Sequence, residues 1–231
     1  MLQYRCEQKF VCTQAQLIIL KTRIKAVMRT DSHQPGECYR VRSLYFDDED
    51  GSAFYDNDAG TDHRRKFRLR VYDHPEARIS LEIKYKKHGD THKEACIVSK
   101  EFCERLLGGE PLPWDRNYPQ PLKEFYRETY EHGLNKRIIV EYERSAFVCR
   151  CGNVRITFDR NIAFSARTSE FLRENLPLVP ILPTGLHLLE VKYDELIPDY
   201  ILQLLETGEL ARTAFSKYYL ACLAQKGEYV W

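Results

Sequence analysis

The chain has 231 residues, of which 43% are hydrophobic and 30% are charged. This is the composition of an ordinary soluble protein with a sizeable core, and a barrel of this length commonly forms one domain. Lysine and arginine number 35 against 34 for aspartate and glutamate, so the net charge of +1 excludes a general attraction to nucleic acid or to an acidic membrane. We therefore expect one domain over residues 1–231, with basic character confined to a site.

The eight cysteines have no Cys-x-x-Cys pair and no regular spacing. Zinc sites usually need such pairs, so we expect reduced thiols in a cytoplasmic protein. No window approaches the roughly 20 apolar residues of a membrane span, and the N-terminus lacks the apolar core of a signal peptide. The sequence therefore predicts no membrane segment in this chain.

Alternating apolar and polar residues predict eight β-strands. They cover residues 4–11, 39–46, 64–72, 78–87, 91–97, 137–149, 153–159 and 187–194. Helical spacing and capping residues predict helices from residue 13 to the turn at 31–36, and at 53–57, 99–107, 121–132, 198–206 and 213–224. This order predicts an α+β fold whose antiparallel strands close into a barrel.

Charged residues occupy alternate positions in five of these strands. They are Arg5, Glu7, Lys9, Arg68, Arg70, Glu82, Lys84, Arg155, Asp159, Glu190 and Lys192. Successive side chains of a strand point to opposite faces, so each strand has one apolar and one charged face. If helices cover the apolar faces, the charged faces enclose a cationic interior that suits a polyanion and a metal ion.

The segment 64–70 holds five cations in seven residues. These cations repel one another unless water or an anion screens them, so we expect removal of Arg68 and Arg70 to raise the melting temperature of the empty protein. Guanidinium groups offer phosphate a planar fork of donors. A solvated surface strand and a nucleic-acid interface stay open at this stage. Nucleic acid would need stacking platforms, for which Tyr72 and Tyr142 are the candidates.

Glu190 lies well inside a strand, after Leu188 and Leu189 and before Val191. A carboxylate among cations is either a structural counter-ion or an oxygen ligand for Mg²⁺ or Mn²⁺. Both interpretations stay open from the pattern. The seven histidines are scattered, and none lies on a charged strand face beside Ser or Cys, so the sequence predicts no nucleophile and base pair.

An ordered set of motifs runs over nearly the whole chain. The motifs are Glu7-x-Lys9-Phe10, Ser43-Leu44-Tyr45-Phe46-Asp47, Lys66-Phe67-Arg68-Leu69-Arg70, Leu81-Glu82-Ile83-Lys84, Tyr142-x-Arg144-x-Ala146-Phe147, Arg155-Ile156-Thr157-Phe158-Asp159, Glu190-Val191-Lys192 and Ser216-Lys217-Tyr218. Together they resemble the VTC (vacuolar transporter chaperone) polyphosphate-polymerase domain, one of the triphosphate tunnel metalloenzymes. The resemblance implies an eight-stranded antiparallel tunnel barrel with a polar, basic interior and peripheral helices.

The resemblance also implies a function, because such domains transfer the γ-phosphate of ATP to a growing inorganic polyphosphate chain. ATP and polyphosphate are then the expected partners, and Mn²⁺ or Mg²⁺ the expected cofactor, held by Glu190. Carried over by motif, the catalytic phosphate-binding residues are Lys9, Arg68, Arg70, Lys84, Arg144, Arg155 and Lys217. Lys93 matches as a further phosphate ligand, and we add Lys192, Tyr72 and Glu7 as substrate contacts.

One departure from the pattern lies in the first strand. The wider superfamily carries Glu-x-Glu-x-Lys there, and in this chain Arg5 stands in place of the first acid. Loss of that carboxylate weakens the case for a second metal. A triphosphatase or nucleotidyl cyclase of the same fold and a non-catalytic polyphosphate-binding module stay open, as does a membrane-bound partner protein. We expect no nucleic-acid partner, because Phe67 and Phe158 lie on the core side of their strands.

Overall fold

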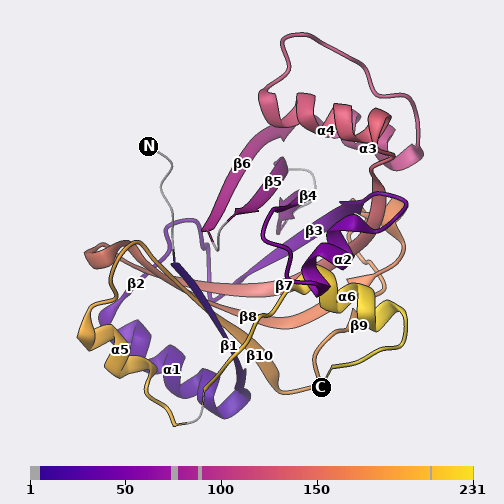
Figure 1. Ribbon diagram of the computed structural model, residues 1–231. Coiled ribbons are helices and arrows are strands. Elements are labelled where there is room, and N and C mark those ends of the chain that lie inside the picture. Colours follow the sequence, from indigo (N-terminus) through magenta and orange to yellow (C-terminus); the bar gives the residue numbers. More distant parts are fainter. Residues whose placement is uncertain (1–5, 74–77, 88–89, 209, 231) are drawn as a thin grey trace.

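The computed structural model describes the whole chain except residues 1–5, 74–77, 88–89, 209 and 231. The fold is mixed α+β, built on one large antiparallel sheet (Figure 1). Its long strands are β1 (Cys6–Thr13), β3 (Tyr39–Asp47), β4 (Arg64–Tyr72), β5 (Ile79–Lys87), β6 (Asp90–Val98), β7 (Asn135–Cys149), β8 (Val154–Ser165) and β10 (Leu186–Tyr193). Two-residue strands are β2 (Arg29–Thr30), β9 (Val179–Pro180) and β11 (Ala211–Arg212).

The sheet is not closed and has eleven described strands, which corrects the expected eight-stranded barrel. Its order is β11-β1-β10-β8-β7-β3-β4-β5-β6, so β1 and β6 do not pair in the described part of the chain. The edge of β1 is partly occupied, because its residues 10–11 pair with β11 and the Thr213 N–H donates to the Lys9 carbonyl at 2.9 Å. Residues 211–213 therefore bond to part of the β1 edge, which another strand would have to occupy if the sheet closed into a barrel.

Helices cover the apolar face of the sheet in two groups. Helices α1 (Gln14–Val27) and α5 (Asp199–Leu205) lie side by side against β1, β8 and β10 (Figure 1). Helices α3 (Lys100–Gly108) and α4 (Gln120–Glu131) cover β4, β5 and β6. The capping box predicted for α1 is confirmed, since Thr13 and Gln16 exchange hydrogen bonds. None of the described helices is long and apolar enough to cross a membrane.

Helices α2 (Ser52–Asp58) and α6 (Lys217–Gln225) lie on the opposite face, which we call the inner face because it carries Arg68 and Glu190. Their apolar residues pack against the inner side of β3 and β7. The inner face is therefore apolar under α6 and polar beside it. Helix α6 begins later than the predicted residue 213, because Ser216 is its N-cap and accepts from the Tyr219 N–H. This start places Lys217 in the first turn, at the edge of the polar region.

Candidate functional site

A cavity of about 790 Å³ lies on the inner face, between the two ends of the curled sheet and the start of α6. Among the described residues, eleven cationic side chains and two carboxylates line it. The cations are Lys9, Arg64, Lys66, Arg68, Arg70, Lys84, Lys86, Arg144, Lys192, Arg212 and Lys217, and the carboxylates are Glu7 and Glu190. Such an excess of positive charge in a concave site attracts polyanions.

The structure brings nine of the twelve predicted site residues to this cavity. They are Glu7, Lys9, Arg68, Arg70, Lys84, Arg144, Glu190, Lys192 and Lys217. The other three lie outside it. Arg155 pairs with Asp31, and Lys93 is half exposed beside Glu82. Tyr72 is 39% exposed and contacts another aromatic ring. The departure at Arg5 falls outside the described residues.

The predicted site residues left out several residues that line the cavity, although Arg64 and Lys66 belong to the basic segment that the sequence singles out. Arg64 and Lys66 share the strand face of Arg68, and Lys86 shares that of Lys84, so the period of two could have identified them. Arg212 lies in a two-residue strand, which carries no periodic signal.

Glu190 is the deepest carboxylate of the cavity, and it is 5% exposed. Four cations surround it: its carboxylate oxygens lie 3.2 Å from Lys217, 3.4 Å from Arg144, 3.5 Å from Lys192 and 3.8 Å from Lys9. Burial alone raises the pKa of Glu190, but these cations outweigh it and hold the pKa well below its usual range. Glu190 is therefore ionised at any working pH.

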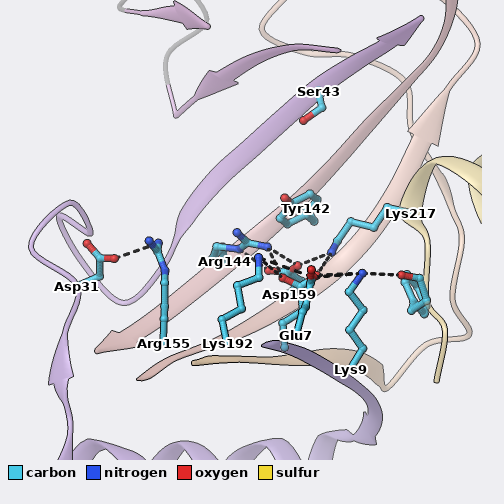
Figure 2. Close-up of polar contacts among 12 residues, drawn as sticks. Glu7, Lys9, Asp31, Ser43, Tyr142, Arg144, Arg155, Asp159, Lys192 and Lys217 are labelled. Carbon is cyan, nitrogen blue, oxygen red and sulfur yellow. Dashed lines mark hydrogen bonds and ion pairs between the residues drawn. The ribbon is translucent and has the colours of Figure 1, made fainter. Parts of the chain in front are cut away.

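Asp159 lies behind the cavity wall and fixes the positions of two of these cations, Arg144 and Lys217 (Figure 2). It accepts two parallel hydrogen bonds from Arg144, at 2.6 and 2.7 Å, and pairs with Lys217 at 2.7 Å. The Tyr142 ring lies 5.1 Å from the Arg144 guanidinium carbon and 4.8 Å from the Lys217 nitrogen. A bidentate pair fixes the plane of a guanidinium, so Arg144 is held in one orientation before any ligand binds.

Glu7 connects the two ends of the open sheet. Its carboxylate lies 3.3 Å from Lys9 on its own strand and 3.3 Å from Lys84 on β5. Burial alone raises the pKa of Glu7, but Lys192, Lys9 and Lys84 lower it below its usual range. The sheet thus curls until β1 and β5 meet through side chains, although β1 and β6 do not pair.

Glu82 is the carboxylate partner of two arginines of β4, Arg68 and Arg70. Its carboxylate accepts from Arg68 Nη2 at 2.6 Å and from Arg68 Nε at 2.8 Å, and it lies 3.5 Å from Arg70. The expectation that these two arginines repel each other across an empty interior overlooked this partner. A buried cation and its carboxylate stabilise each other, so removing one leaves the other uncompensated.

Lys66 links α2 to the start of α6. Its ammonium group donates to Asn57 Oδ1 at 2.6 Å and to Ser216 Oγ at 3.0 Å. Burial lowers the pKa of Lys66 to about 7, and the nearby cations Arg64 and Lys84 add to the effect. Lys66 is therefore partly neutral near physiological pH.

Among the described residues that line the cavity, Glu190 and Glu7 are the carboxylates that could hold a metal ion. The described residues contain no group of three or more His, Cys, Asp or Glu side chains placed to hold a metal. Mg²⁺ is usually bound through one or two carboxylates, with waters and substrate phosphates completing its shell. The donor set fits a hard divalent ion that arrives with a phosphate ligand, and it does not fit zinc.

The family model of the VTC domain matches residues 4–225. The chain belongs to the VTC domain family. Comparison of this VTC domain with curated proteins gives no match.

Two solved structures share the fold of this VTC domain. A proposed adenylate cyclase from Bacillus halodurans has a TM-score of 0.51 at 12% identity, covering 88% of this chain and 87% of its own. A proposed adenylyl cyclase from Hippeastrum, described as having a dominant triphosphatase activity, has a TM-score of 0.54 at 12% identity, covering 99% of this chain and 97% of its own. At this identity the likeness to both structures concerns the fold alone.

Arg68→Ala should destabilise the VTC domain by about 3 kcal/mol, because it leaves Glu82 with weaker partners in a buried position. Arg64→Ala is the matched control, since among the described residues Arg64 donates to two backbone carbonyls and has no carboxylate partner. This substitution should cost less than about 1 kcal/mol. Urea unfolding of both variants measures the difference. If Arg68→Ala were instead more stable than the wild type, repulsion among the cations of this segment, as expected from the sequence, would be the dominant effect.

Tripolyphosphate binding at about pH 8 should take up protons, because Lys66 is largely neutral there and a bound anion raises its pKa. Affinity should accordingly fall as pH rises above about 7. Calorimetry in two buffers of different ionisation enthalpy measures the uptake. Lys66→Arg, which keeps the charge but does not titrate in this range, should reduce the uptake. Equal uptake by the variant and the wild type would rule out Lys66 as its source.

Proposed function

We propose that this VTC domain is a metal-dependent polyphosphate polymerase, which transfers the γ-phosphate of ATP to the end of an inorganic polyphosphate chain. The observation that carries the proposal is the convergence of cations from β1, β4, β5, β7, β10 and α6 on one cavity around Glu190. Phosphoryl transfer asks a protein mainly to position the reactants and to stabilise charge on the phosphoryl oxygens. A cage of this kind supplies both.

The proposed roles follow from the position of each residue relative to Glu190. Lys9, Arg144, Lys192 and Lys217 surround Glu190 and are placed to bind the reacting phosphates. Arg68, Arg70 and Lys84 line the facing strands and bind the remainder of the phosphate chain. The acceptor is a terminal phosphate that is already anionic, so the reaction needs no dedicated general base. No histidine among the described residues lines the cavity, in keeping with this chemistry.

Ligand binding in this scheme exchanges one anion for another. The ammonium groups of Lys9 and Lys217 exchange their contact with Glu190 for phosphate oxygens. Asp159 stays paired with Arg144 and Lys217 and holds both side chains in orientation. Glu190, with Glu7, then becomes available to hold Mg²⁺ or Mn²⁺. A bound divalent ion neutralises charge that develops on the phosphoryl oxygens.

Triphosphate hydrolysis is the second candidate, because the Hippeastrum protein that shares the fold is described as a dominant triphosphatase. The same cage serves either reaction, and the difference lies in whether phosphate or water accepts the phosphoryl group. Lys93 and Tyr72 lie outside the cavity, so neither is given a role in this mechanism.

Incubation of the purified protein with ATP and Mn²⁺ should give a polymer that stains as polyphosphate, together with ADP. Glu190→Gln should reduce this turnover about 100-fold or more, because several kcal/mol of charge stabilisation are lost with the metal. Glu143→Gln is the control for the same change on a strand, since Glu143 lies outside the cavity and pairs with Arg160. Manganese binding in the presence of tripolyphosphate, followed by electron paramagnetic resonance, should fall in Glu190→Gln alone.

Free phosphate without polymer would replace the polymerase proposal by the triphosphatase. Tight tripolyphosphate binding without turnover would leave a binding module. Full activity and manganese binding in Glu190→Gln would remove the metal role of this residue.

A further inference from the structure

Arg155 lies next to the proposed site but outside its cavity. In the sheet it stands directly opposite Lys192, so both side chains occupy the inner face. Lys192 lines the cavity, whereas Arg155 does not. A phosphate chain that extended along the inner face past Lys192 would meet Arg155 next.

In the structure Arg155 already has an anionic partner. Its guanidinium lies 3.0 Å from the Asp31 carboxylate and donates to the Tyr39 hydroxyl at 3.4 Å. Figure 2 shows this pair set apart from the cations that converge on Asp159 and Glu7. Asp31 is 6% exposed, so the pair is largely shielded from solvent on its acidic side.

Residues 31–37 form a strap that carries Asp31 across this end of the inner face. The Asp31 N–H donates to the Ala146 carbonyl at 3.0 Å, and the Ala146 N–H donates to Gln34 Oε1 at 2.7 Å. The Ser145 hydroxyl donates to the Glu37 carbonyl at 2.8 Å. These three bonds do not use the Asp31 carboxylate, but within the strap that carboxylate accepts from the His33 N–H at 3.0 Å and lies 3.1 Å from His33 Nδ1. Asparagine at this position keeps an acceptor oxygen for the N–H bond, so the strap can keep its place when the charge is removed.

Thr157 lies between Arg155 and Asp159 on the inner face of β8. It stands opposite Glu190 in the sheet and shares a strand face with Arg155, two residues away. Its side chain is almost fully buried, and its hydroxyl has no hydrogen-bond partner within the described part of the chain. Thr157 does not line the cavity, so the two partly exposed cations, Lys192 and Arg155, are the groups that offer charge to a ligand on this part of the inner face, among the described residues.

We propose that Asp31 limits the length of the phosphate chain that the inner face binds, by neutralising Arg155 beyond Lys192. This rests on the proposed function, because it concerns the same phosphate chain. While Asp31 is charged it stays paired with Arg155, so a longer phosphate chain gains no additional cation beyond Lys192. Without that charge, Arg155 becomes an additional phosphate ligand.

Calorimetric titration with tripolyphosphate and with long-chain polyphosphate tests the proposal, using the variant-to-wild-type affinity ratio for each ligand. Asp31→Asn should bind the long chain about tenfold more tightly, the gain expected from one added charge-assisted hydrogen bond, and tripolyphosphate within about twofold of the wild type. Glu37→Gln is the matched control, because it removes the same charge from an exposed position of the same strap, where Glu37 pairs with Lys21 and Lys25. It should change neither affinity.

Two further variants assign the effect to Arg155. Asp31→Asn combined with Arg155→Gln should lose the gain for the long chain. Arg155→Gln alone should leave tripolyphosphate affinity within about twofold of the wild type. This variant tests whether Arg155 lies beyond the part of the inner face that binds the short chain, even if Asp31→Asn does not fold.

Equal gains for both ligands, a gain in Glu37→Gln, or no gain in a folded Asp31→Asn would each overturn the proposal. A loss of tripolyphosphate affinity in Arg155→Gln would also overturn it, since Arg155 would then already bind the short chain. Failure of the wild type to bind tripolyphosphate at all would contradict the proposed function, and this proposal with it.

Discussion

The pairing of inward-facing cations with buried carboxylates is the interaction on which the rest of this structure depends. A cation taken out of water is costly unless an anion compensates it. Glu82 compensates Arg68 and Arg70 of β4, while Asp159 and Glu190 compensate Arg144 of β7 and Lys217 of α6. The protein can therefore fold with a cationic interior before any ligand arrives. The apolar faces outside can pack as in any α+β protein, because the most buried of the inward cations have carboxylate partners within.

The compensating carboxylates differ in how accessible they are to a ligand. Asp159 is fully buried and does not line the cavity, whereas Glu7 and Glu190 line it. Under the proposed function, Asp159 is a permanent counter-ion that preserves orientation, and Glu190 is an exchangeable one. Such preorganisation is what phosphoryl transfer requires, since charge must be stabilised without rearranging the protein at the moment of reaction. The pair between Asp31 and Arg155 extends the same principle to the edge of the site.

Sequence periodicity predicted the long strands and the inward direction of residues such as Arg68 and Lys84, because direction depends only on the period of two. It could not predict that Glu82 forms an ion pair with Arg68, because the cross-strand register places these two residues opposite each other and no local pattern gives that register. The open edge between β1 and β6 depends on where residues 211–213 return, which no local pattern encodes. Arg155 was placed with the phosphate ligands, and its partner Asp31 lies in a turn without periodicity.

A crystal structure of the protein with tripolyphosphate and Mn²⁺ tests the central claim most directly. The account predicts the phosphate chain in the cavity, with Lys9 and Lys217 moved from Glu190 onto phosphate oxygens, Arg144 still paired with Asp159, and Mn²⁺ on Glu190. A phosphate chain bound at the outer surface, or one bound in the cavity while every ion pair of Glu190 stays intact, would contradict it.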